Sequence, residues 1–182
     1  MKTIQVPDFK TLNELYDFFM AAYSHCPFHR HLTAYASKDE VKIICELGIK
    51  QGGSTAALLI TQPDELYSYD IRISQIKSNL FRRLSGRTKL SIIEADSTQV
   101  KCVPCDMLVI DTYHTQEHIA IELQLHAPQV RHYIVCHDAN YPKGSKPEGM
   151  LRATITEYAN KNGWVVDMDD PTATGTMAIR RC

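Results

Sequence analysis

The sequence predicts an α/β protein, in which a doubly wound, mostly parallel sheet ends in an antiparallel hairpin. Strand-like and helix-like segments alternate from residue 41 onward, which is typical of a parallel sheet with helices on both faces. Segments such as "DMLVID" and "YIVCHD" are continuously apolar, as strands buried on both faces are. The last two strand-like segments have no helix between them, so we expect them to pair as a hairpin.

The elements are justified in chain order by their periodicity. Residues 10–23 carry apolar side chains near helical spacing and predict an amphipathic helix outside the sheet. Residues 24–36 show no clear pattern. Strands are predicted at 41–47, 65–71, 89–96, 106–111, 132–138, 164–168 and 176–181. Helices are predicted at 54–62, 74–84, 115–130 and 149–163, the last with Gly163 at its C′ position.

Length and composition favour one globular domain over residues 1–182, with an N-terminal helical segment (1–36) and a core of alternating strands and helices (41–181). The net charge of −1 gives no reason to expect a nucleic-acid partner. No apolar run approaches the ~18–20 residues that span a bilayer, and "MKTIQVPDFK" lacks the apolar core of a secretory signal. We therefore expect a cytoplasmic protein without a membrane partner. The sequence does not decide whether the chain forms a homo-oligomer.

Six cysteines suit such a location. Cys45 and Cys136 lie in apolar runs and are expected to be reduced core residues. The segment "CVPC" (102–105) precedes a strand and has no partner pair, so it is interpreted as a loop and not as a redox or zinc motif.

Acidic residues close five successive predicted strands: Glu46, Asp70, Asp96, Asp111 and Asp138. Ligands of such sheets bind beyond the carboxyl ends of the strands, so the five residues predict a polar rim that faces a ligand. Each has a simpler alternative when taken alone, such as a solvated strand end, a helix N-cap or an ordinary turn.

The rim begins at the turn "ELGIKQGGST" (46–55), whose glycines permit a close approach of the backbone to a ligand. A phosphate-binding loop needs a lysine directly before its Ser or Thr, but this chain has Gly53 directly before Ser54 and Thr55. The dinucleotide fingerprint needs a glycine where Lys50 stands. Neither of these two nucleotide motifs therefore fits.

Residues 41–181 resemble the class I S-adenosylmethionine-dependent methyltransferases. The resemblance rests on "CELGIKQGGST", "YSYDI", "IIEADST", "MLVIDTYHTQEH", "YIVCHDANYP" and "GTMAIRR". It is greatest to the branch of small-molecule and sugar O-methyltransferases and cephalosporin-hydroxylase-like proteins. It implies a Rossmann-like methyltransferase fold with a seven-stranded sheet. Relatives often carry a second acidic residue or Asp-Asn where this chain has His137-Asp138-Ala139, and a glycine where it has Thr112.

The resemblance also implies roles for residues that would bind S-adenosyl-L-methionine. Glu46 would accept hydrogen bonds near its amino-acid end, Asp70 would bind both ribose hydroxyls, and Asp96 would accept from the adenine amine. The implied cofactor-binding residues are Glu46, Gly48, Gly52, Gly53, Ser54, Asp70, Ile71, Asp96, Ser97 and Asp111.

Methyl transfer requires an aligned acceptor and removal of its proton. Asp111 and His114 are the predicted catalytic residues, with His114 as general base because its ordinary pKa is ~6.5. The alternative is a structural, hydrogen-bonded histidine. Asp111, His137 and Asp138 could hold a divalent cation such as Mg²⁺ or Mn²⁺.

The predicted function is methyl transfer to an oxygen of a small molecule or sugar. The first alternative is a protein that binds the cofactor without catalysis, or an assembly subunit. The second is a nucleotide-sugar or NAD enzyme. Residues 24–31, "SHCPFHRH", are expected near the pocket mouth or on plain surface, and residues 140–149 as a lid or acceptor loop.

Overall fold

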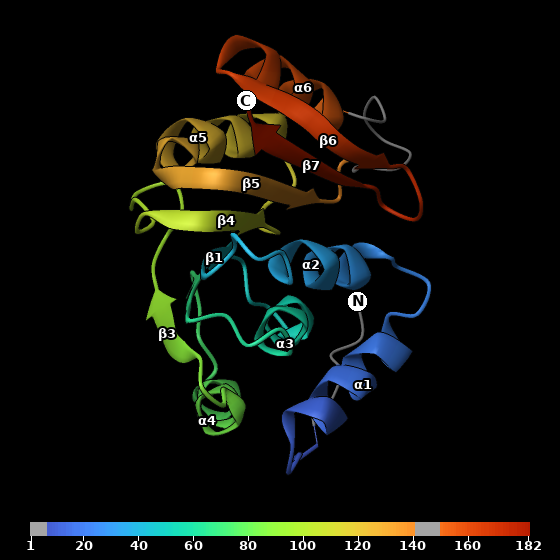
Figure 1. Ribbon diagram of the computed structural model, residues 1–182, viewed down its shortest axis with the longest axis vertical. Helices are drawn as coiled ribbons and strands as arrows, with labels where there is room; N and C mark the ends of the chain where they lie inside the picture. The colour runs from blue at the N-terminus through green and yellow to red at the C-terminus, as the bar shows by residue number, and fades with distance from the viewer. Residues whose placement is uncertain (1–6, 141–149) are drawn as a thin grey trace.

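The computed structural model describes residues 7–140 and 150–182, and its centre is one seven-stranded sheet (Figure 1). The strands are β1 (Ile43–Leu47), β2 (Glu65–Asp70), β3 (Lys89–Glu94), β4 (Cys105–Ile110), β5 (Val130–His137), β6 (Trp164–Asp170) and β7 (Thr176–Arg181). Their order is β3-β2-β1-β4-β5-β7-β6, and only β7 runs in the opposite direction, antiparallel to both β5 and β6. The predicted doubly wound sheet and its closing hairpin are confirmed.

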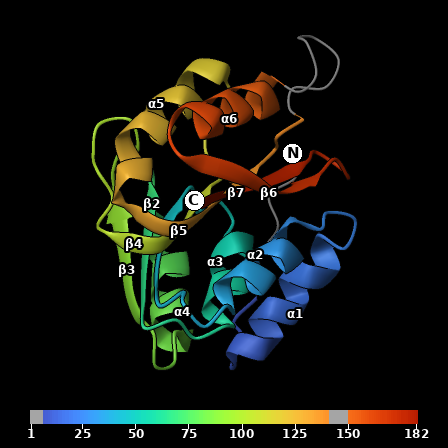
Figure 2. The same cartoon turned by 45° about the horizontal axis from the view of Figure 1, so that its top comes forward.

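Helices cover both faces of the sheet (Figure 2). One face is covered by α1 (Leu12–Ala22), α2 (Phe28–Ala36), α3 (Gly53–Leu59) and α4 (Gln75–Leu84). The other is covered by α5 (Gln116–His126), which continues into a 3₁₀ turn (Ala127–Gln129), and by α6 (Met150–Lys161). Each layer buries its own apolar core against the sheet, so the central strands β1 and β4 are buried on both faces, as continuous apolar runs predict.

The helix α2 was not predicted. Its signal is short: Phe28, Leu32 and Tyr35 recur at helical spacing and are buried, after a proline at the N-cap position. The predicted helix at 115–130 ends at His126, because Pro128 cannot continue an α-helix. Gly163 has the positive φ of +72° that its predicted place after α6 needs. Residues 141–149, most of the predicted lid, lie outside the described residues.

The turn from β1 to α3 depends on glycine at two positions. Gly48 has a φ of +93°, and a Cβ atom there would lie 2.1 Å from the carbonyl oxygen of Asp111. Gly52 has a φ of +92°, and its missing Cβ would lie 2.3 Å from the Phe81 ring. The turn can therefore pass between β4 and α4 only without side chains at these points.

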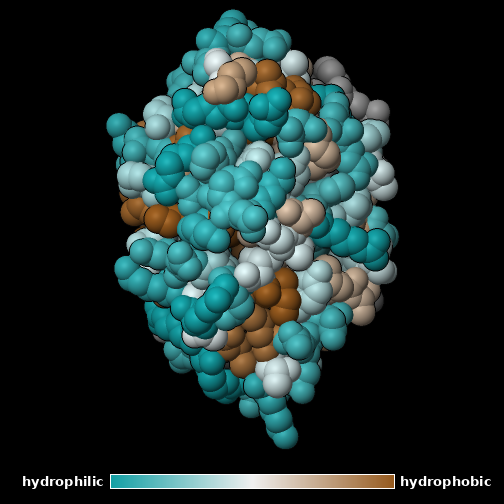
Figure 3. Space-filling model, in the orientation of Figure 1, coloured by the Kyte–Doolittle hydropathy of each residue, from teal (hydrophilic) through white to brown (hydrophobic). Residues whose placement is uncertain are grey.

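The outer surface is mostly hydrophilic in the view of Figure 3, with apolar residues confined to small patches. In the described parts of the chain, no helix has the length and apolar character needed to cross a membrane.

Substitution of Gly48 by alanine is expected to destabilise the fold far more than the same change at Gly163. Both residues have positive φ, but nothing lies within 4 Å of a Cβ at Gly163. Gly163→Ala should therefore cost about 1 kcal/mol of unfolding free energy. Gly48→Ala adds a clash with backbone and should cost roughly 3 kcal/mol or more. Urea denaturation measures both, and equal losses would contradict the close approach of Gly48 to Asp111.

Candidate functional site

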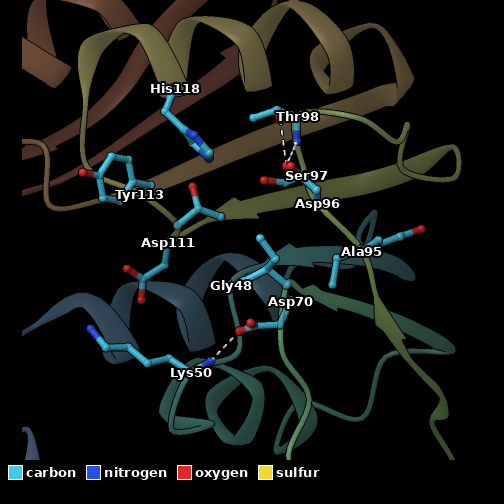
Figure 4. A pocket seen from close by; sticks show the side chains of 13 residues that line it. Gly48, Lys50, Asp70, Ala95, Asp96, Ser97, Thr98, Asp111, Tyr113 and His118 are labelled. Atoms are coloured by element: carbon cyan, nitrogen blue, oxygen red, sulfur yellow. Dashed lines mark hydrogen bonds between the residues drawn. The ribbon is translucent and has the colours of Figure 1, made fainter.

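A cavity of about 500 Å³ opens at the carboxyl ends of β1, β2, β3 and β4 (Figure 4). Six of the predicted cofactor-binding residues line it: Gly48, Asp70, Ile71, Asp96, Ser97 and Asp111. Three parallel strand ends thus bring their polar residues to one space, as the predicted rim requires.

Asp70 holds the glycine turn in place. Its Oδ2 accepts hydrogen bonds from the backbone N–H groups of Ile49 (2.8 Å) and Lys50 (2.9 Å), and its Oδ1 accepts one from Arg72 (3.0 Å). A carboxylate has about four acceptor sites, so Asp70 retains capacity for a ligand while it fixes the turn. Ile71 beside it is 67% exposed at the cavity, which offers an apolar surface next to a carboxylate.

Asp96 is fixed on the opposite side of the cavity by a local turn. Its Oδ1 accepts from the backbone N–H (2.9 Å) and the hydroxyl (2.7 Å) of Thr98, and these bonds lower the pKa of Asp96. The neighbouring Ser97 hydroxyl donates to Oε1 of Glu122 (2.6 Å), so it is already engaged. Glu122 is fully buried and also accepts from Thr112 (2.8 Å). Sequence reasoning missed this anchor, because nothing in the local pattern of α5 marks it.

Glu46 lies beneath the glycine turn. Its side chain is fully buried, lines neither of the two cavities at the strand ends, and accepts from the hydroxyls of Ser68 (2.6 Å) and Thr55 (2.9 Å). The residue fastens the start of α3 to β2 beneath the turn. Burial raises its pKa to about 7, although the hydroxyl hydrogen bonds lower it.

A second cavity, of about 340 Å³, lies on the other side of Asp111. Asp111 and Lys50 line both cavities. Gly52, Gly53 and Ser54 line only the second one. These three predicted cofactor-binding residues are therefore placed to meet a ligand only where it extends past Asp111.

Two histidines and two carboxylates form a charged cluster in the second cavity. His114 Nε2 lies 2.9 Å from Asp138 Oδ2 and 3.5 Å from Asp111 Oδ1. His137 Nδ1 lies 3.1 Å from Asp111 Oδ1. Asp138 has a φ of +54°, unusual for a residue other than glycine, immediately after β5. This backbone conformation positions its carboxylate beside His114.

The cluster sets the charge state of His114, the predicted general base. Burial lowers the pKa of His114, but its contacts with Asp111 and Asp138 outweigh this and raise that pKa to about 9. Burial raises the pKa of Asp111, yet the two imidazoles hold it well below its usual range. A histidine that is protonated at neutral pH cannot accept a proton. In this state His114 is therefore a charged hydrogen-bond donor.

The candidate metal ligands lie in the same cluster. The ligand atoms of Asp111, His114 and Asp138 lie within 4.8 Å of one another. His137 Nε2 instead lies 3.5 Å from the Cys26 sulfur and 3.2 Å from the Thr174 hydroxyl oxygen. Two carboxylates and one imidazole form a donor set that suits Mn²⁺ and its neighbours in the transition series. His114 therefore replaces His137 in the candidate set.

The N-terminal segment completes the second cavity, which agrees with its expected place near the pocket mouth. Cys26, Phe28 and His29 all line the cavity, and the Phe28 ring stacks on His137 with centroids 4.1 Å apart. Burial, with a smaller effect of His137, lowers the pKa of His29 to about 4. His31 lies elsewhere, 2.7 Å from Asp170.

The sequence and the fold were compared with those of known proteins. No protein-family model and no curated protein matches the sequence. Among the solved structures that match is magnesium protoporphyrin IX methyltransferase from Synechocystis with bound S-adenosylmethionine, with a TM-score of 0.65, 15% identity and 100% coverage of both chains. The fold is that of the class I methyltransferases.

Two other class I structures support this assignment of the fold. A methyltransferase from Podospora anserina with bound S-adenosylhomocysteine has a TM-score of 0.62 and 14% identity, over 97% of this chain and 89% of its own. A ribosomal protein L11 methylase from Lactobacillus delbrueckii has a TM-score of 0.62 and 11% identity, over 88% of this chain and 80% of its own. A porphyrin and a ribosomal protein appear in these names, so the class I fold is common to methyltransferases of very different acceptors.

Glu46→Gln is expected to change how stability depends on pH. The pKa of Glu46 is raised from 4.5 to about 7 in the folded chain. The protonated side chain therefore stabilises the folded state fully below pH 4.5, and this stabilisation is lost as the pH rises to 7. The stability of the parent relative to the Gln variant should fall over this window by about 3 kcal/mol at most. Urea denaturation from pH 4.5 to 8 measures it, with the exposed Glu117→Gln as the charge control. A flat difference would contradict a buried Glu46 whose hydrogen bonds offset only part of the cost of burying its charge.

Proposed function

We propose that this protein is an S-adenosylmethionine-dependent methyltransferase that acts on an oxygen of a small molecule or sugar. The observation that carries the proposal is the pair of cavities that meet at Asp111. A methyl donor in the first and an acceptor in the second would face each other across this residue. In-line displacement needs such an arrangement, because it fixes both reactants before reaction.

The first cavity suits the adenosine part of the cofactor. Asp70 and Asp96 face it from opposite sides with charged oxygens that accept from ribose hydroxyls and an exocyclic amine. Ile71 provides the apolar contact for a ring. The methionyl part would extend along Gly48 and Asp111 toward Gly52 and the second cavity.

The same geometry argues against an NAD enzyme. A dinucleotide places its pyrophosphate at the start of the first helix of the sheet, but the residues at the start of α3 line the second cavity and not the first. The classical dinucleotide order is 3-2-1-4-5-6 with parallel strands, whereas here the antiparallel β7 lies between β5 and β6.

Non-catalytic cofactor binding is the second candidate function. It is favoured by the charged cluster, in which the carboxylates of Asp111 and Asp138 pair with the imidazoles of His114 and His137, so none of these four groups is poised to remove a proton at pH 7. An acceptor oxygen that ionises readily, as in a phenol or carboxylic acid, needs least help from a base. Turnover of such acceptors with S-adenosylmethionine would distinguish an enzyme from a binding protein.

Binding of S-adenosylhomocysteine is the test of the proposed cofactor site. Asp70→Asn keeps an acceptor oxygen for the turn but removes the charge, and should weaken binding about 10- to 100-fold, because hydrogen bonds to charged groups contribute roughly 1.5–3 kcal/mol. Calorimetric titration gives the Kd. Asp64→Asn, exposed at the other end of β2, is the matched control and should bind like the parent. An unaltered Kd for Asp70→Asn, or a parent that prefers NAD, would refute the assignment.

A divalent cation is a further proposed ligand of Asp111, His114 and Asp138. It would supply charge that lowers the pKa of an acceptor hydroxyl. Mn²⁺ is expected to raise the Tm of the parent by mass action and to have little effect on Asp138→Asn, while Asp64→Asn responds like the parent. Equal shifts in all three proteins would show that Mn²⁺ binds elsewhere.

A further inference from the structure

Three buried cysteines gather in the core layer under α5 and α6, apart from both cavities. Cys45 lies on β1, Cys102 in the connection between β3 and β4, and Cys105 at the start of β4. Their sulfur atoms all lie within 4.8 Å of one another. The three residues are 0%, 4% and 0% exposed, and none lines either cavity. The cluster therefore has no part in the proposed methyl transfer.

Specific contacts hold the connecting segment over β1. The Cys45 thiol lies 3.6 Å from the carbonyl oxygen of Val103. The backbone N–H of Cys102 donates to His126 Nδ1 (3.1 Å), and His126 Nε2 lies 2.7 Å from the carbonyl oxygen of Ser97. Both nitrogens of this fully buried histidine are thus occupied by the segment itself. His126 acts as a brace that holds Cys102 against the other two thiols, and it is not available as a fourth ligand.

We propose that Cys45, Cys102 and Cys105 bind one soft, thiophilic metal ion in a three-coordinate site, with Cu⁺ as the best fit. Thiolate ligands select soft ions. Structural zinc sites almost always take four ligands, and the described residues bring together only these three sulfur atoms. Sulfur ligands about 2.3 Å from an ion stand about 4 Å apart in a trigonal arrangement, so the thiols need only a small adjustment.

The binding step is balanced without a redox partner. Each thiol that ligates the ion loses its proton to solvent as its sulfur–metal bond forms, and copper stays in the +1 state throughout. The exposed Lys101 and Pro104 flank Cys102 in the connection and Cys105 at the start of β4, so surface residues adjoin two of the three thiols.

Anaerobic titration of the full, reduced chain with Cu⁺ against a colorimetric Cu⁺ chelator tests the proposal. Cys26→Ser and Cys182→Ser form the background, since these thiols lie outside the cluster and are partly or fully exposed. One equivalent of Cu⁺ should be retained. Cys45→Ser and Cys102→Ser should each lose at least about tenfold in affinity, while Cys136→Ser, a buried core cysteine outside the cluster, should not. Zn²⁺ in a parallel titration should bind more weakly.

The proposal fails if the background protein retains no Cu⁺, or if Cys45→Ser binds as the background does. It also fails if Cys136→Ser loses as much affinity. Should the serine variants of the cluster not fold, X-ray absorption of the Cu⁺-loaded background protein decides instead. Three sulfur neighbours are expected, and a shell of nitrogen or oxygen would overturn the assignment.

Discussion

The close approach of the ends of β1 and β4 is the constraint on which the site depends. Gly48 leaves β1 so near to the backbone of Asp111 that no Cβ fits between them. Hydrogen bonds fix the approach on both sides, from Gly48 N–H to the Tyr69 carbonyl (2.8 Å) and from Asp111 N–H to the Leu47 carbonyl (2.9 Å). The contact places the Asp111 side chain between the two cavities, where it lines both of them.

Buried carboxylates beneath this contact hold the walls in position. Glu46 fastens α3 to β2, and Glu122 joins the loop after β3, through Ser97, to the loop after β4, through Thr112. Such buried acidic groups persist only where hydroxyl or amide donors satisfy them. The rim of acidic residues therefore has two levels. Asp70, Asp96 and Asp111 line the first cavity, and Asp111 and Asp138 line the second. Glu46, together with Glu122 from α5, acts as an internal support.

Local patterns were sufficient to predict the sheet and the upper level of this rim. Parallel strands end on the same edge, so Asp70, Asp96, Asp111 and Asp138 come together once the strands are recognised. The burial of Glu46 could not be predicted, because it depends on the partners Ser68 and Thr55 that only the packed α3 supplies.

The other features of the site that the sequence did not predict depend on contacts between distant parts of the chain. Cys26 meets His137 across 111 residues of sequence, and no local pattern predicts such a pairing. The charge of His114 depends in the same way on its position between two carboxylates from different strands. The cysteine cluster is a further case, since the "CVPC" segment lacks a second cysteine pair in sequence and finds its third thiol on β1.

A crystal structure of the chain with S-adenosylhomocysteine tests the central claim most directly. The account predicts that the adenosine lies between Ile71 and Asp96, with its ribose at Asp70 and its sulfur directed past Asp111 toward the second cavity. Density for the ligand outside this crevice, or a crevice closed by packed side chains in crystals grown with saturating ligand, would contradict it.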